Sequence, residues 1–155
     1  MGGVVLIGVG GFAGAIARYL VDSEVSQRFA AFPWGTFVVN VSGSFMVGLV
    51  FALIGDRAAL PAELRGPLMI GFLGAYTTFS TLALESWRMI EDGAWLLAAL
   101  NLGASVAIGM VAVVGGLALG RAISRDAGRW LDDAGEGRSD RLPRSVTPPL
   151  QFGYR

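Results

Sequence analysis

The chain has 155 residues, of which 54% are hydrophobic and 15% charged. It contains no histidine and no cysteine, which excludes disulfides, imidazole or thiolate catalysis and transition-metal sites built from those ligands. All 12 basic residues are arginine and 12 acidic residues balance them, so the charge does not indicate nucleic-acid binding. The carboxylates form no spaced pair within an apolar stretch, and we therefore do not expect an enzyme.

Four apolar stretches are each long enough to cross a bilayer. About 20 apolar residues in an α-helix span a hydrocarbon core of about 30 Å. The stretches cover residues 4–21, 36–54, 67–84 and 94–120, and the charged residues gather in the connectors between them. The sequence therefore predicts an all-α integral membrane protein, with four transmembrane helices forming one domain over residues 1–120.

The first stretch has two competing interpretations. A cleaved signal peptide normally has basic residues before its apolar segment, and none precedes residues 4–21. Residues 4–7, followed by Gly8, Gly10 and Ala13, imitate the strand-turn-helix fingerprint of a dinucleotide-binding fold. That fold needs alternating strands and amphipathic helices, whereas this chain continues into segments that are apolar on every side. We therefore interpret the stretch as a first transmembrane helix.

Neutral polar side chains recur at four-residue spacing in two of the predicted helices. Thr36 and Asn40 share one face of the second helix, and Asn101 and Ser105 repeat the arrangement in the fourth. Amide and hydroxyl groups donate hydrogen bonds without carrying a charge. A file of such groups suits a small anion that must be desolvated and then released.

The third stretch carries the most polar segment at membrane depth. Residues 71–81 read Gly-Phe-Leu-Gly-Ala-Tyr-Thr-Thr-Phe-Ser-Thr, with four threonine and serine hydroxyls among apolar neighbours. Hydrocarbon offers no water, so these groups need protein partners or a wet pathway. Small and hydroxylated residues also let membrane helices pack closely. Phe79 offers the positive edge of its ring, although a single phenylalanine is more often a lipid or helix contact. The whole cluster favours a functional site.

Residues 121–155 have a different composition. Twelve of these 35 residues are charged and three are proline, so we expect a tail that is disordered beyond its first turn or two. Arg121, Arg125 and Arg129 are four residues apart. They either extend the fourth helix with a basic face toward lipid headgroups or form a solvated helix end.

Three motifs on successive predicted helices resemble the Fluc (CrcB) family of fluoride channels. The resemblance covers residues 3 to about 119, and three motifs in the same order are far more specific than any one of them. The motifs are Gly11-x-x-Gly14-Ala15-x-x-Arg18-Tyr19, Gly35-Thr36-x-x-Val39-Asn40-x-x-Gly43-x-Phe45-x-x-Gly48 and Gly71-Phe72-x-Gly74-x-x-Thr77-Thr78-Phe79-Ser80-Thr81.

The resemblance implies a multi-pass channel of the cell membrane that exports fluoride down its gradient and so lowers cytoplasmic fluoride toxicity. It also implies an antiparallel dimer with two pores, in which the third helix breaks near the midplane. Backbone carbonyls at Gly74 and Thr77 are implied to hold one structural Na⁺ that is not transported. An unwound turn at the midplane leaves free carbonyls, and a hard cation satisfies them. Glycine at position 74 is expected to ease the break.

For the fluoride pore, the resemblance implies Asn40 as a donor, Phe79 as the aromatic edge and Thr36 on the same helix as Asn40. The polar track continues through Thr78, Ser80, Thr81, Asn101 and Ser105. Arg18 matches a family arginine at the aqueous vestibule. In the alternative interpretation, the Arg18 side chain only extends from a helix end to the lipid headgroups. Leu82 departs from the family, which usually has a second phenylalanine there.

Two other functions stay open. A small four-helix multidrug-type exporter would also be an antiparallel dimer, but it usually places a carboxylate in the middle of a span. A non-transporting membrane assembly subunit would use the glycines for packing alone, which leaves the hydroxyls and amides on three spans unexplained.

The distribution of arginine bears on the dimer. Four spans put both termini on one side, with arginines at positions 57, 65, 121, 125 and 129, against positions 28 and 88 on the other. By the positive-inside rule this excess favours one orientation. We expect either a heterodimer with a related subunit of opposite bias or an antiparallel homodimer of dual topology.

Overall fold

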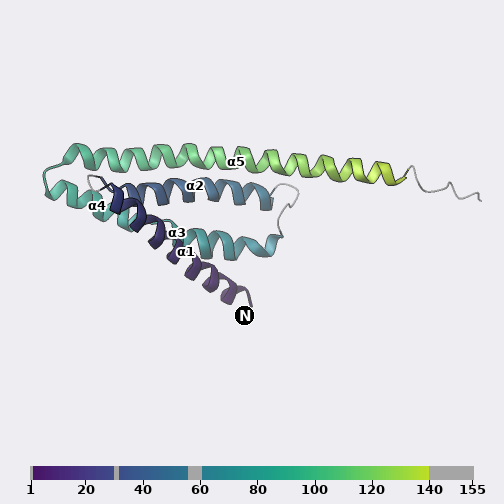
Figure 1. The fold of residues 1–155 in the computed structure, drawn as a ribbon, viewed down its shortest axis with the longest axis horizontal. Coiled ribbons are helices and arrows are strands. Elements are labelled where there is room, and N and C mark those ends of the chain that lie inside the picture. The colour runs from purple at the N-terminus through teal and green to yellow at the C-terminus, as the bar shows by residue number, and fades with distance from the viewer. Residues whose placement is uncertain (1, 30–31, 56–60, 140–155) are drawn as a thin grey trace, which may run out of the picture.

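The computed structural model describes residues 2–29, 32–55 and 61–139, and these residues are almost entirely helical (Figure 1). The order of the elements is α1 (Gly2–Arg28), α2 (Trp34–Gly55), the 3-10 turn η1 (Ala62–Leu64), the π-helix η2 (Gly66–Leu73), α3 (Gly74–Tyr76), α4 (Phe79–Glu91) and α5 (Trp95–Ser139).

Four helical segments are long and apolar enough to cross a membrane. They are Gly2–Arg28, Trp34–Gly55, Ala62–Glu91 and Trp95–Asp126. The third combines η1, η2, α3 and α4 into one interrupted span. The prediction of an all-α, multi-pass membrane protein with four transmembrane helices is therefore confirmed.

The second and fourth spans pack side by side along most of the length of α2 (Figure 1). A Cβ atom on Gly48 would overlap the carbonyl oxygen of Val113, and one on Gly116 would overlap that of Phe45. These glycines let the two backbones approach closely, as small residues commonly do in membrane helices.

Glycines also let the first span cross η2 at close range. A Cβ on Gly10 would overlap the carbonyl of Pro67, and one on Gly14 would overlap that of Phe72. From the other side, a Cβ on Gly71 would meet the carbonyl of Ile7. Several glycines of the sequence motifs are therefore explained by helix packing alone.

The third span is broken in its middle, as predicted. Thr77 has φ −78° and ψ 155°, and Thr78 has φ −148° and ψ 111°, so both residues are extended between α3 and α4. Gly74 itself is helical, with φ −65° and ψ −31°. The expectation that glycine at position 74 eases the break is wrong, because any residue adopts this conformation and the chain unwinds three residues later.

The fourth helix extends further than expected. The backbone of α5 remains helical to Ser139, beyond the one or two turns anticipated past Arg121. No proline occurs between positions 95 and 142, and alanine, leucine, arginine and glutamate in this segment favour a helix. The rest of the predicted tail, residues 140–155, lies outside the described residues.

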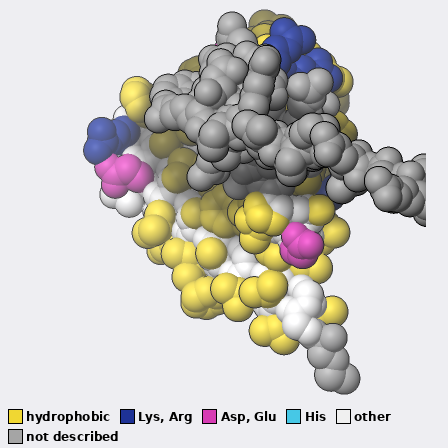
Figure 2. Space-filling model, turned by 90° about the vertical axis from the view of Figure 1, so that its right-hand side faces the viewer, with side chains coloured by type: hydrophobic (Ala, Val, Ile, Leu, Met, Phe, Trp, Pro, Cys, Tyr) yellow, Lys and Arg dark blue, Asp and Glu magenta, His cyan; other side chains and the backbone are white. Residues whose placement is uncertain are grey.

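Large apolar side chains cover much of the outer surface. Figure 2 shows hydrophobic side chains across the described part of one face, with few charged side chains among them. Phe12, Tyr19 and Phe79 are exposed by 71%, 71% and 77%. Such a surface is stable only against lipid or another protein, which agrees with a membrane-embedded chain.

Candidate functional site

The break in the third span is held by a side chain of the second. The Asn40 Nδ2 atom donates a hydrogen bond to the Thr78 carbonyl oxygen at 3.0 Å, and the Thr78 amide donates to Asn40 Oδ1 at 2.8 Å. An extended residue inside a helical span cannot pair its backbone within the helix, and hydrocarbon supplies no water. Asn40 therefore satisfies both backbone groups of Thr78.

The same region redirects two amide hydrogens away from carbonyls of the span. In a regular α-helix the Thr78 amide would bond to the Gly74 carbonyl, and the Thr81 amide to the Thr77 carbonyl. Here Thr78 donates to Asn40, and the Thr81 amide donates to Thr78 Oγ1 at 3.3 Å. The carbonyls of Gly74 and Thr77 thus lack their regular helical donors, and both flank the break.

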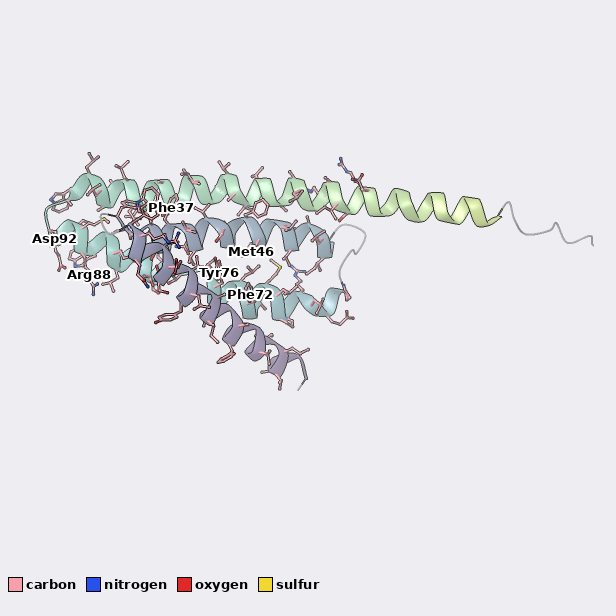
Figure 3. All side chains as sticks on the ribbon, in the orientation of Figure 1. Phe37, Met46, Phe72, Tyr76, Arg88 and Asp92 are labelled. Carbon is pink, nitrogen blue, oxygen red and sulfur yellow. The ribbon has the colours of Figure 1, made fainter. Side chains whose placement is uncertain are left out.

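A second contact ties the break to α2. The Ser42 hydroxyl lies 2.6 Å from the Val38 carbonyl and 2.9 Å from the Tyr76 hydroxyl. Because Ser42 has one hydrogen to donate to Val38, Tyr76 donates to Ser42. The buried Tyr76 ring also stacks on Phe72 with centroids 5.9 Å apart, on the same span (Figure 3). Sequence reasoning missed this contact.

The predicted hydroxyl cluster forms at the start of α4. Thr78 caps this helix, and its Oγ1 atom lies 2.9 Å from Thr81 Oγ1 and 3.3 Å from Ser80 Oγ. Thr78 is buried and Ser80 is exposed. The structure therefore brings together three residues that the sequence assigned to one polar track.

Two cavities border this cluster. The first, of about 280 Å³, contains Asn40 and Phe79; its lining is Asn40, Ser44, Val47, Thr77, Thr78, Phe79, Leu82, Ser105, Val106 and Val113. The second, of about 230 Å³, is lined by Ala15, Arg18, Tyr19, Asp22, Thr36, Val39, Thr78 and Thr81. Thr78, at the break, lines both cavities.

Arg18 and Thr36 line the second cavity, and Thr36 is bonded to Glu85, which is not among the lining residues. The Thr36 hydroxyl, 2% exposed, donates to Glu85 Oε1 at 2.7 Å. Glu85 Oε2 is buried and has no hydrogen-bond partner within the described part of the chain. Sequence reasoning gave Glu85 no role, although it follows Phe79 and Leu82 at three-residue steps.

Asn101 and Ser105, the two residues of the fourth helix predicted to line the pore, are in different surroundings. Asn101 is fully buried, donates to Ser86 Oγ at 3.0 Å and is not among the residues lining either cavity. Ser105 lines the first cavity, and its buried hydroxyl has no hydrogen-bond partner among the described residues. Asn101 thus joins α5 to α4, whereas Ser105 borders the cavity that contains Asn40.

The two cavities differ in character: the first is mainly apolar with a few uncharged polar groups, and the second is more polar and contains charged side chains. The first cavity is lined by amide, hydroxyl, aromatic and aliphatic groups, without an ionisable side chain among its lining residues. The second contains Arg18 together with Asp22. Among the described residues, no group of three or more His, Cys, Asp or Glu side chains could hold a metal ion. The first cavity therefore offers uncharged hydrogen-bond donors, whereas charged side chains line the second.

Comparison with known proteins places the chain in a family. Residues 5–117 match the model described as CrcB-like protein, Camphor Resistance (CrcB). A fluoride-specific ion channel FluC of Maridesulfovibrio salexigens is 48% identical over 118 residues, which are 76% of this chain and 94% of that protein. The FluC of Magnetococcus marinus is 43% identical over 118 residues, 76% of this chain and 96% of that protein. The FluC of Rhizobium meliloti is 42% identical over 124 residues, 79% and 99% of the two chains. The chain belongs to the CrcB-like family.

Proposed function

We propose that this chain is a fluoride-specific ion channel of the plasma membrane, which passes fluoride down its gradient without enzymatic chemistry. The observation that carries the proposal is the pair of cavities that share Thr78 at the break, lined by the neutral donors Asn40, Thr78 and Ser105. The relatives named fluoride-specific ion channel support the choice of ion. In a microbe, such a channel lowers the toxicity of fluoride that has entered as its weak acid.

Uncharged donors fit the energetics of passage. A hydrogen bond to an ion contributes about 1.5–3 kcal/mol, so a few donors offset part of the lost hydration without trapping the ion. An amide nitrogen carries two hydrogens, and the bond to Thr78 uses one of those on Asn40. Asn40 can therefore hold the break and donate to fluoride at once. Phe79 adds the positive ring edge, and Arg18 lies toward the entrance.

The channel is proposed to be an antiparallel dimer, either of identical chains or with a related subunit. Phe79 lines the first cavity and is nevertheless 77% exposed in one chain. A large exposed ring needs lipid or another protein to cover it, and in the proposed dimer the second subunit would do so. Each pore would then combine donors of one chain with contacts from the other.

A structural Na⁺ fits the carbonyls at the break. Hard cations take oxygen ligands, and the Gly74 and Thr77 carbonyls are those whose regular helical donors are redirected to side chains. In an antiparallel pair, two carbonyls from each chain would converge on the two-fold axis. Bound Na⁺ would satisfy these carbonyls and join the subunits, while fluoride moves through separate pores.

One observation favours a second candidate function, a cation-coupled multidrug-type exporter. Such exporters use an embedded carboxylate, and Glu85 lies inside the third span and bonds to Thr36. Membership of the CrcB-like family favours the channel. The channel and the exporter differ in the ion that moves and in what drives it. Fluoride flow through a channel is electrogenic and stops without a compensating ion, whereas a coupled exporter moves its cationic substrate when a proton gradient is applied.

The test is fluoride efflux from liposomes that contain the purified chain and are loaded with potassium fluoride. We expect rapid efflux at a fluoride electrode only after the potassium ionophore valinomycin is added, and slow chloride efflux from matched liposomes. Protein-free liposomes control for leakage of hydrogen fluoride. Wild-type liposomes that match the protein-free ones, or that release chloride equally fast, would contradict the proposal.

A further inference from the structure

We infer that Ser44, which the sequence motifs do not assign, is a further specificity-determining residue of the anion path. Its hydroxyl is the next donor for the ion beyond Asn40 and Ser105. This inference rests on the proposed fluoride channel and adds a position to it.

Ser44 continues a file of polar residues along one face of α2. Thr36, Asn40 and Ser44 are four residues apart, which puts them on the same side of the helix. Thr36 lines the second cavity, while Asn40 and Ser44 line the first. The file therefore passes the break and extends one turn past it.

The Ser44 hydroxyl is available, unlike that of its neighbour. Serine in a helix commonly donates to a carbonyl in the preceding turn, and Ser42 does so to Val38 while it also contacts Tyr76. The Ser44 hydroxyl forms no hydrogen bond with any described residue. The Ser105 hydroxyl in the same cavity is likewise without a partner in the described chain. Buried or half-buried hydroxyls normally find partners, and a passing anion supplies one.

The fourth helix leaves this hydroxyl uncovered. A Cβ atom on Gly109 would lie 3.3 Å from Ser44 Oγ, so a larger side chain at position 109 would crowd it. Gly109 is one turn beyond Ser105 on α5, and Ser44 is one turn beyond Asn40 on α2. The two helices therefore offer donors in succession, with Ser44 opposite a glycine.

Ser44 is also the last hydroxyl at its end of the cavity. The lining residues that follow along α2 and α5 are Val47 and Val113, which cannot donate a hydrogen bond. Without Ser44, an anion leaving Asn40 would meet only aliphatic side chains there. Fluoride depends on donated hydrogen bonds more strongly than larger halides do, because its charge is concentrated in a smaller volume. Ser44 should therefore affect both rate and selectivity.

The matched substitutions are Ser44→Thr and Ser44→Val, which have nearly the same shape and differ in one hydroxyl. We expect Ser44→Val to reduce fluoride efflux about tenfold or more, the order expected from losing one hydrogen bond to an ion. We also expect it to raise the fluoride concentration for half-maximal flux. Ser44→Thr should stay within about threefold of wild type in efflux, because it keeps the donor. Crowding against Gly109 is equal in both variants.

The controls separate this inference from the proposed channel. Wild-type protein without fluoride efflux would defeat the channel, whereas wild-type efflux with equal rates and half-saturation in the two variants would overturn the role of Ser44. If size-exclusion chromatography shows that neither larger variant folds, Ser44→Ala, whose side chain is smaller than the native one, replaces them in the efflux test. Ser44→Ala with wild-type efflux and unchanged fluoride-over-chloride selectivity would also overturn it.

Discussion

Asn40 and Thr78 form two hydrogen bonds with each other, one in each direction, between the side chain of α2 and the backbone of the broken third span. The pair gives the break a partner within the protein, so the extended backbone persists at membrane depth. It also places an amide donor in the first cavity, bonded to Thr78, which lines both cavities. The structure of the break and the proposed passage of the ion thus depend on the same residue.

Replacing Asn40 with valine should lower both stability and flux. The change leaves the Thr78 amide and carbonyl without partners, at about 1–3 kcal/mol for each buried group, and removes the proposed donor to fluoride. We expect a reduced unfolding temperature and at least a tenfold loss of fluoride efflux, since each 1.4 kcal/mol corresponds to about a factor of ten. Val38→Ala, a change of an exposed residue on the same helix, is the control. Wild-type efflux in Asn40→Val would remove Asn40 from the pore.

The aromatic contacts predict opposite effects at two neighbouring positions. Phe79→Ile keeps an apolar side chain but loses the positive ring edge, so fluoride efflux should fall by several-fold or more. Leu82→Phe adds a second ring to the lining of the same cavity and should preserve or raise efflux. If the rings merely filled space, Leu82→Phe would narrow the cavity and slow the ion. Electrode measurements on both variants, with dimer content checked, distinguish the two accounts.

Sodium should matter for structure without being transported. Exchange of Na⁺ for the larger Cs⁺ should slow fluoride efflux or lower the thermal stability of the dimer, because the Gly74 and Thr77 carbonyls would hold a poorly sized ion. Gly74→Ala is the matched control. It keeps the carbonyl, its φ suits alanine, and the added Cβ would lie 3.6 Å from the Met69 carbonyl oxygen. It should therefore retain the dependence on Na⁺.

Two outcomes would contradict a structural, untransported Na⁺. Unchanged efflux and melting temperature after prolonged removal of Na⁺ would argue against the site. Accumulation of radioactive sodium at the rate of fluoride would show that the cation is cargo.

Arginine placement predicts the orientation of the chain. Among described residues, Arg28 and Arg88 lie at one end of the bundle, and Arg65, Arg121 and Arg125 lie at the other; Arg88 is labelled in Figure 3. The positive-inside rule favours the second end in the cytoplasm, so the chain should insert mainly one way and pair with a related subunit.

Reporter fusions to the C-terminus measure this bias directly. A cytoplasmic signal well above the external one is expected. Equal populations, or robust fluoride efflux from this chain purified alone, would instead establish a dual-topology homodimer. Arg121→Ala and Arg125→Ala together reduce the five arginines on that side to three, against two on the other. This double change should shift the populations toward equality, because the rule depends on arginines close to the membrane ends.

The sequence by itself determined the membrane class, the four spans and the polar segment in the third. These features depend on composition and on periods of a few residues, which are local properties of the chain. The spacing of Thr36 and Asn40, for example, puts them on one helix face whatever the tertiary fold. The motif glycines at positions 14 and 48 were equally visible as packing residues, although the carbonyls of Phe72 and Val113 that they approach were not.

Only the tertiary structure decided which polar groups meet. Asn40 and Thr78 are 38 residues apart, and Thr36 and Glu85 are 49 apart, so neither hydrogen bond has a local signature. The same reason separates Asn101, paired with Ser86, from Ser105, whose hydroxyl borders a cavity. The partner of a side chain at membrane depth depends on how the helices cross, and close crossings are set by backbone contacts between glycines and distant carbonyls.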